Sequence, residues 1–294
     1  MRLFKDALAR RGMSVLAVLP GLLVLFIVLG LFLKSRAVLA VQPLARVLFG
    51  SSWHPLHGSF GLFPFIMGTV WVTVTALLLA VPVSILTAIY LSEFAPRSVR
   101  EFARPIVDLL AGLPSVVYGL WGVLLIVPFV GRWLAPLFGV ASTGYSVLAG
   151  GMVLAVMIFP TIIHVSLEVF ASIPFSLREA SFSLGATRWE TARCVVLRKG
   201  TPGILAASVL GFSRAFGETM AVLMVAGNVP AAPTSLFDPG YPLPALIANN
   251  YGEMMSVPLY DSALMLAALV LLAVVLFFNV LARRILIRVE RRVR

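Results

Sequence analysis

Six long apolar runs constrain the fold of this chain more than any other feature. A helix of about twenty apolar residues is about 30 Å long, which matches the hydrocarbon core of a bilayer. The composition agrees, because 60% of the 294 residues are hydrophobic and only 12% are charged. We therefore expect an all-α integral membrane protein with about six transmembrane helices. The runs cover roughly residues 14–33, 66–91, 105–130, 145–165, 203–226 and 259–282.

The first run could instead be a cleaved signal peptide, since basic residues precede it and Val38-Leu39-Ala40 offers small residues for cleavage. Its apolar stretch is longer than the apolar core of a signal peptide. We therefore expect a retained helix that forms, with the loop after it, an N-terminal unit over residues 1–65. Residues 66–282 then form the transmembrane domain, and residues 283–294 form a basic cytoplasmic tail.

The basic residues predict the orientation, because Lys and Arg beside membrane spans are retained on the cytoplasmic side. If the N-terminus is inside, the four cytoplasmic segments hold 4, 3, 5 and 6 basic residues, against 4 in all the outer loops. We therefore predict that both termini are cytoplasmic. The net charge of +11 is scattered over loops between spans. A nucleic-acid-binding surface would need these charges on one face, so we expect no nucleic-acid partner.

The chain offers few side chains that could bind a metal. Cys194 is the single cysteine, so a disulfide within the chain is excluded. His54 and His57 stand three residues apart across Pro55 with no Cys, Asp or Glu beside them, and we interpret them as part of a solvated loop. We expect neither a metal site nor a cofactor.

The longest inner segment, residues 166–202, is patterned too strongly to be a simple connection. Apolar residues recur among charges, which predicts two short helices separated at Gly185. The first helix should begin after Pro174, with Ser176 as a candidate N-cap. An amphipathic pair outside the membrane needs a surface to bury against. That surface could be a partner protein or the interface of the protein's own membrane.

Within that segment, residues 178–190 resemble the EAA loop of ABC importer permeases, in which E-A-A is followed by three residues and then G. Glu179, Ala180 and Gly185 match the pattern, and Ser181 replaces the second alanine. The resemblance implies the type I importer permease fold. It also implies that this loop is a coupling helix seated in a cleft of a cytoplasmic ATPase. Gly185 would then supply the sharp turn.

Three further stretches are similar to phosphate-specific permeases, and to their C-type subunit in particular. Residues 211–228 contain R-A-F-G-E-T, residues 110–122 read LAGLPSVVYGLWG, and residues 91–96 read LSEFAP. The similarity spans about residues 60–290, although Leu197-Arg198 stands where Leu-Pro is expected. It implies that the chain forms half of a pathway for inorganic phosphate. Permeases for molybdate, tungstate or sulfate share the scaffold and remain alternatives.

The same resemblance implies a set of partners and a location. The partners are two cytoplasmic ATP-binding subunits, a second homologous permease and an extracytoplasmic phosphate-binding protein, together with membrane lipid. The location is the plasma membrane of a bacterium or archaeon, which the chain crosses several times.

Arg214 is the only basic residue deep in a predicted span, where a charge costs about 2.5–3.5 kcal/mol on insertion scales. Glu218, one turn later, could pair with it and only neutralise it. Alternatively, Arg214 attracts an oxyanion in transit while Glu218 weakens the binding. Hydroxyl groups that could assist are those of Ser115, Tyr118 and Thr219, unless they bond their own backbone.

The sequence contains no nucleotide site of its own. A P-loop needs Gly-Lys followed by Ser or Thr, and the three lysines follow Phe, Leu and Arg instead. ATP hydrolysis is therefore expected on a partner, and the chain itself is not expected to be an enzyme. A membrane hydrolase is the alternative, but Gly211-Phe-Ser213-Arg214-Ala lacks the last glycine of a nucleophile elbow, and His164 has only Glu168 nearby. A passive channel would not need the coupling loop.

Overall fold

The computed structural model describes residues 2–253, 257 and 259–293 of this helical protein. Residues 1 and 294, at the outer limits of the predicted N-terminal unit and tail, lie outside the described residues. In the described part of the chain, six segments are long and apolar enough to cross a membrane, which confirms the expected all-α membrane fold. They are Gly12–Val41, Phe63–Phe94, Ser115–Leu137, Val147–Ser172, Arg188–Phe216 and Tyr260–Ile285.

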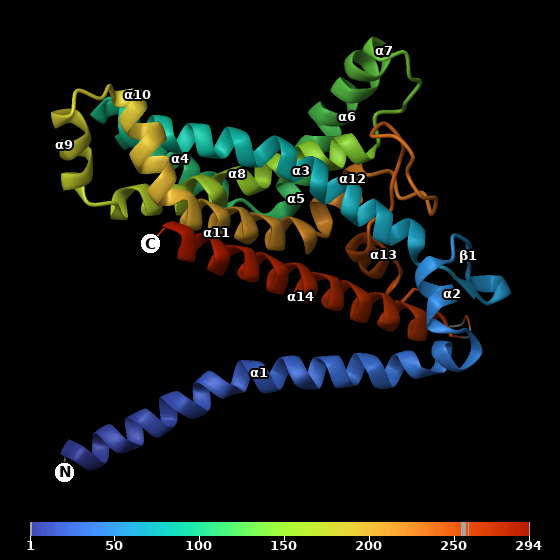
Figure 1. Ribbon diagram of the computed structural model, residues 1–294. Helices are drawn as coiled ribbons and strands as arrows, with labels where there is room; N and C mark the ends of the chain where they lie inside the picture. Colours follow the sequence, from blue (N-terminus) through green and yellow to red (C-terminus); the bar gives the residue numbers. More distant parts are fainter. Residues whose placement is uncertain (1, 254–256, 258, 294) are drawn as a thin grey trace.

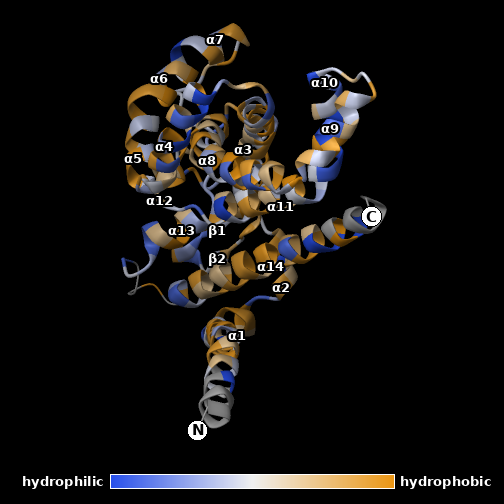
Figure 2. Ribbon diagram, turned by 90° about the vertical axis from the view of Figure 1, so that its left-hand side faces the viewer, coloured by the Kyte–Doolittle hydropathy of each residue, from blue (hydrophilic) through white to orange (hydrophobic). Residues whose placement is uncertain are grey.

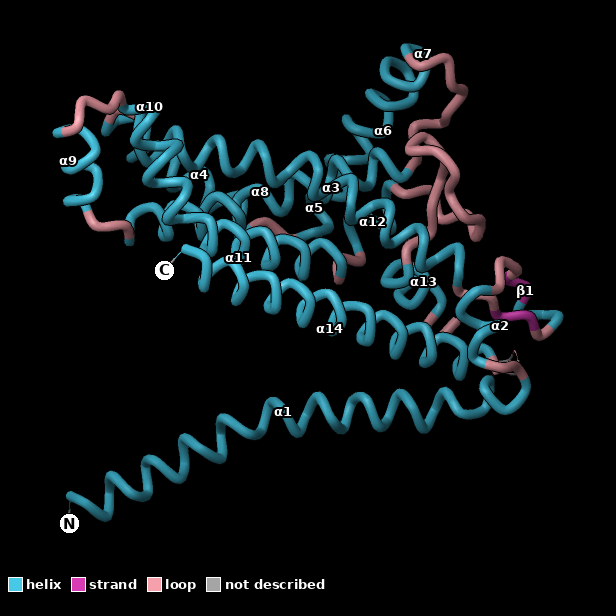
Figure 3. The backbone as a smooth tube through the Cα atoms, in the orientation of Figure 1, coloured by secondary structure: helices cyan, strands magenta, loops and turns pink. Residues whose placement is uncertain are grey.

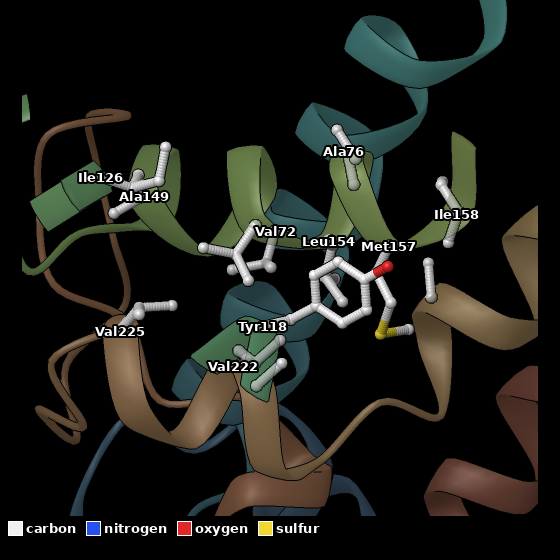
Figure 4. Packing of buried hydrophobic residues seen from close by; sticks show 14 of the residues in the cluster. Val72, Ala76, Tyr118, Ile126, Ala149, Leu154, Met157, Ile158, Val222 and Val225 are labelled. Carbon is white, nitrogen blue, oxygen red and sulfur yellow. The ribbon is translucent and has the colours of Figure 1, made fainter. Parts of the chain in front are cut away.

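Helices α3 (Phe63–Ile89) and α8 (Val147–Ser172) form the centre of the bundle. Small residues let them approach closely, since a Cβ atom on Gly151 would lie only 2.5 Å from Cγ2 of Thr75. Figure 4 shows Val72 and Ala76 of α3 packed among residues of α8. Helix α11 (Leu197–Phe216) packs along α8 as well.

The third predicted span, residues 105–130, is wrong in its position. Helix α4 (Arg97–Gly112) is a separate amphipathic helix with no buried residue. The chain is extended at Leu113 and Pro114, because a proline disfavours helical backbone in the residue before it. The membrane-spanning segment starts only at Ser115. It contains α5 (Ser115–Trp121), η3 (Gly122–Ile126), α6 (Val127–Phe129), η4 (Val130–Leu134) and α7 (Ala135–Leu137).

The fifth predicted span, residues 203–226, is also corrected, because it is two helices rather than one. Helix α11 ends at Phe216, residues 217–219 are not helical, and α12 (Met220–Val225) follows. Gly217 is the C-cap residue of α11, with φ −92° and ψ 0°. At its other end α11 begins earlier than predicted, since it continues from η5 (Ala192–Val196).

Helix α1 (Arg2–Val41) touches the rest of the protein mainly near its C-terminal end, beside α14 (Tyr260–Val293). Ser262 joins them, since its hydroxyl donates to Lys34 O at 2.8 Å and accepts from Val38 N at 3.0 Å. Towards the N-terminus α1 diverges from α14 (Figure 1, Figure 3). Both termini lie at the end of the bundle that carries α9 (Phe175–Ser183) and α10 (Arg188–Thr191).

The opposite end of the bundle holds loops, short helices and a small hairpin. The elements are α2 (Leu44–Phe49), β1 (Trp53–His54), η1 (Pro55–His57), β2 (Ser59–Phe60) and α13 (Leu243–Asn250). Strands β1 and β2 are antiparallel with Trp53 opposite Phe60. The predicted solvated loop around His54 and His57 is thus a hairpin, and the described residues contain no cluster of three potential metal ligands.

Candidate functional site

The α9–α10 segment, residues 174–191, projects from one end of the bundle as a helical hairpin (Figure 1). The predicted break at Gly185 is confirmed, because this residue has φ +82° between the two helices. The turn is closed by hydrogen bonds from Gly185 N to Phe182 O at 2.9 Å and from Ala186 N to Ser181 O at 3.2 Å. Glycine is the residue that adopts such a backbone most readily, because it has no Cβ atom.

The caps of the hairpin differ from the expectation. The predicted N-cap Ser176 is wrong, because α9 begins at Phe175 with Pro174 as its cap residue. The second helix carries the side-chain cap instead. Thr187 Oγ1 accepts from Glu190 N at 3.2 Å, and Glu190 Oε2 accepts from Thr187 N at 2.7 Å. This reciprocal capping box fixes the direction in which α10 leaves the turn.

The hairpin exposes its apolar side chains. Figure 2 shows hydrophilic and hydrophobic residues interspersed along α9 and α10, and the predicted coupling residues Glu179, Ala180 and Gly185 are all exposed. Leu184 is 89% exposed at the tip. A surface of this kind needs a partner to cover it. The other exposed large apolar residues of the hairpin are Phe175, Leu177, Phe182 and Trp189.

A buried ion pair under the hairpin was not predicted from the sequence. Arg178 of α9 binds Glu93 in η2 (Tyr90–Phe94), with Nη2 at 2.9 Å from Oε1 and Nε at 3.2 Å from Oε2. The two side chains are only 11% and 12% exposed. Both residues stand in stretches that carry the family resemblance. Nothing in the sequence relates positions 93 and 178, so their contact follows from the fold alone.

The second group of predicted site residues lies inside the bundle, around Arg214. Its Nη1 donates to Thr161 Oγ1 of α8 at 3.0 Å. The predicted pair with Glu218 is wrong, because the ion pairs among the described residues do not include Arg214. Glu218 lies beyond the end of α11 and its Oε1 accepts from Ala221 N at 3.3 Å. The break after Phe216 removes the helical spacing on which the pairing depended.

The three predicted hydroxyl groups have different surroundings. Tyr118 is buried and donates to Leu110 O at 2.6 Å, so its hydroxyl bridges the break between α4 and α5. Thr219 Oγ1 lies 3.4 Å from Gly217 O, a local contact within the break. Ser115 is the half-buried first residue of α5.

The depth of Arg214 follows from its neighbours. Its partner Thr161 stands near the middle of α8, and Ser213 beside it donates to Asn279 Oδ1 of α14 at 2.6 Å. Helix α11 therefore ends inside the membrane domain, and the non-helical residues 217–219 lie there too. Irregular backbone at this depth is tolerated where it is buried in protein or lines a water-filled cavity.

The residues of the hydrolase alternative are not arranged for catalysis. Ser213 lies within α11, with its hydroxyl oxygen 3.0 Å from Val209 O one turn earlier, so it is not on a strained turn. His164 stands between Asp108 and Glu168, at 3.8 and 3.7 Å, and is exposed. These separations exceed hydrogen-bonding distance.

Proteins of similar sequence are permeases. The chain is 41% identical over 253 residues to the probable ABC transporter permease protein YqgH of Bacillus subtilis, covering 85% of this chain and 80% of that protein. It is 35% identical over 301 residues to the phosphate transport system permease protein PstC of Mesorhizobium japonicum, covering 98% and 91%. It is 36% identical over 302 residues to PstC 2 of Mycobacterium tuberculosis, covering 97% and 91%.

Two solved structures share the fold. A chain of the inward-facing MetNI methionine ABC transporter matches with a TM-score of 0.61 at 20% identity, covering 78% of this chain and 95% of that chain. A chain of a bacterial alginate ABC transporter, solved with an alginate-bound periplasmic protein, also gives 0.61, at 18% identity, covering 97% and 99%. At such identities the likeness concerns the fold alone.

The permease relatives, together with the shared fold, place this chain among the transporter permeases. The chain belongs to the family described as the binding-protein-dependent transport system inner membrane component, which matches residues 80–294. It is therefore a permease subunit of an ATP-binding-cassette importer and a multi-pass inner-membrane protein. Subunits of this kind are not themselves enzymes.

Proposed function

We propose that this permease forms half of the translocation pathway for inorganic phosphate. Two of the relatives described above are named as phosphate transport permeases. The observation that carries the proposal is Arg214, a cation in the middle of the membrane domain with a hydroxyl partner but, among the described residues, no carboxylate partner. An unpaired charge at that depth is costly, so a mobile anion is a suitable counter-ion.

The chemistry around Arg214 fits an oxyanion. A guanidinium presents planar, forked donors that match phosphate oxygens. The bond to Thr161 orients one nitrogen and leaves others for a ligand. The non-helical residues 217–219 lie beside it, and backbone freed from helical bonding inside a membrane is a frequent component of transport sites. Glu218 would keep the site from holding the anion too tightly.

Further partners follow from the same assignment. The α9–α10 segment would dock on a cytoplasmic ATP-binding subunit, with Glu179, Ala180 and Gly185 at the contact. Both termini would then be cytoplasmic, because they lie at the same end of the bundle (Figure 1). A second homologous permease would complete the pathway, a second ATP-binding subunit would pair with the first, and an extracytoplasmic phosphate-binding protein would deliver the substrate at the opposite end.

Uptake measurements test the substrate. Cells that lack this chain should regain uptake of radiolabelled phosphate when it is restored, and excess molybdate, tungstate or sulfate should not compete. Arg214→Leu should abolish uptake per membrane-inserted protein. Arg132→Leu, an exposed arginine in η4, is the matched control and should leave uptake unchanged. Competition by another oxyanion would reassign the substrate, and normal uptake by Arg214→Leu would remove Arg214 from the pathway.

A further inference from the structure

The attachment of helix α9 to the membrane domain is unusual, because its single buried residue is charged. That residue is Arg178. None of the buried apolar clusters among the described residues contains a residue of α9. The apolar side chains of the helix are exposed instead. Apolar packing therefore contributes little to holding α9 against the transmembrane helices. Its side-chain contacts with the rest of the protein are polar: those of Arg178 and the hydrogen bond between the hydroxyl groups of Ser181 and Thr191, 2.9 Å apart, at the start of the fifth span.

A hollow separates α9 from the helices beneath it. Its volume is about 690 Å³. Phe175 and Phe182 of α9 line one part of it, and Phe94 and Leu167 of the transmembrane helices line another. The Arg178–Glu93 pair also lines this space. The helix is thus tied to the bundle by a pair that stands beside open space rather than inside a packed core.

Arg178 makes four hydrogen bonds that reach two different elements. Two go to Glu93 in η2, at the end of α3. The other two run from Nη1 to Ile173 O at 2.8 Å and from Nη2 to Phe170 O at 2.9 Å, at the C-terminal end of α8. A cation also interacts favourably with the carbonyl groups at a helix C-terminus. One side chain therefore connects α9 to both central helices of the bundle.

Glu93, the acceptor of the pair, and the segment that carries it are held by further hydrogen bonds. Segment η2 is a π-helical turn, a form that often occurs at functional sites. Arg100 of α4 holds it through bonds of 2.9 Å from Nε to Leu91 O and from Nη2 to Ser92 O. Ser92 Oγ donates to Glu93 Oε1 at 2.9 Å. Glu93 is therefore a fixed point to which α9 is bound.

We propose that the Arg178–Glu93 pair is the positioning contact that transmits movement of the α9–α10 segment to α3 and α8. The inference rests on the proposed docking of this segment on an ATP-binding subunit. The pair has the necessary properties, because bidentate charge-assisted hydrogen bonds are directional and strong, and the two side chains are only 11% and 12% exposed although they line the hollow. Without it, α9 would lose its contact with Glu93 at the end of α3, and part of a shift of α9 would be absorbed in the hollow.

The test measures coupling in the assembled transporter, reconstituted in proteoliposomes with its ATP-binding subunits and binding protein. Uptake and ATP hydrolysis are recorded together. Glu93→Gln and Arg178→Lys each keep the side-chain size or the charge but lose the bidentate pair. Both should lower the number of substrate ions moved per ATP by about tenfold, the factor that corresponds to the loss of an interaction free energy of about 1.4 kcal/mol. Arg97→Gln, which breaks the exposed pair between Arg97 and Glu101, is the control and should change nothing.

A merely structural role predicts a different result. Insertion and assembly would fall, but the complexes that do assemble would move as many ions per ATP as the unmodified protein, and this outcome would overturn the proposal. If both variants fail to assemble, Ser92→Ala distinguishes the coupling role from the merely structural role, since it removes only the hydrogen bond that orients Glu93. It should lower the ratio about two- to fivefold, and an unchanged ratio refutes the proposal. Failure of the unmodified protein to bind an ATP-binding subunit would instead refute the proposed function.

Discussion

Replacing Gly185 with valine tests whether the turn between α9 and α10 is needed to couple the ATPase to transport. Gly185 has φ +82°, and a Cβ atom placed on it would meet no other atom within 4 Å. A side chain at position 185 would therefore be disfavoured by backbone strain alone. A left-handed conformation costs an L-residue about 1–2 kcal/mol, and a β-branched side chain is among the least tolerated there.

The chain can relieve that strain only by opening the turn. Opening would move Thr187 and Glu190, whose reciprocal bonds start α10. A strain of about 1–2 kcal/mol changes the ratio of closed to open turns by about 5- to 30-fold. We therefore expect Gly185→Val to reduce both uptake and transport-stimulated ATP hydrolysis by about that factor, while the membrane domain stays folded.

Two controls separate the turn from general destabilisation. Gly185→Asn should be nearly normal, because asparagine tolerates left-handed backbone. Gly252→Val introduces the same strain at the opposite end of the bundle, since Gly252 has φ +88° and equally open surroundings. It should leave coupling unchanged. The reasoning is refuted if Gly185→Val keeps normal uptake and stimulated hydrolysis, or if Gly252→Val impairs them as strongly.

The double variant Arg214→Leu with Glu218→Leu should reach the membrane but not take up phosphate. Arg214 and Glu218 are not paired, so removing the second charge should not restore the transport lost with the first. Near-normal uptake would contradict the pathway role. Tyr118→Phe should lower the free energy of unfolding by about 0.5–1.5 kcal/mol and keep uptake, since its hydroxyl bridges the α4–α5 break; lost uptake with unchanged stability would assign it to the pathway. Hydrogen bonds from the side chain and backbone of Thr234 lower the pKa of Asp238 from its ordinary value of 3.8. The ionised carboxylate therefore stabilises its loop fully above pH 3.8, and this stabilisation is lost as the pH falls through the lowered pKa. Asp238→Asn should therefore reduce the melting temperature at pH 7, with a difference that shrinks in acid; a difference independent of pH would exclude ionisation as the cause.

Hydrophobicity and length were sufficient to predict the number of membrane spans. The cost of placing polar groups in a bilayer acts on each segment separately, so it is readable from composition. The turn at Gly185 was predictable for a similar reason, because a glycine between two amphipathic stretches is a local signal. The resemblance of residues 178–190 to an EAA loop was likewise a local pattern.

Local signals failed where a helix breaks inside an apolar run. The segment around Gly217 reads as one continuous span, yet α11 ends at Phe216, and this break separates Arg214 from Glu218. Hydropathy reports whether residues can be buried in lipid, but it does not report whether their backbone stays helical. The tertiary structure decided the partner of Arg214, because Thr161 comes from another helix.

For the ion pair of Arg178 and Glu93, too, the sequence determined one part and the tertiary structure decided the other. The sequence by itself determined that both residues are charged and that Arg178 belongs to an amphipathic segment outside the apolar runs. Their contact depends on the packing of α3 against α8, which brings the end of one helix beside the end of the other. A contact across 85 residues depends on three-dimensional packing, so only the tertiary structure could reveal it.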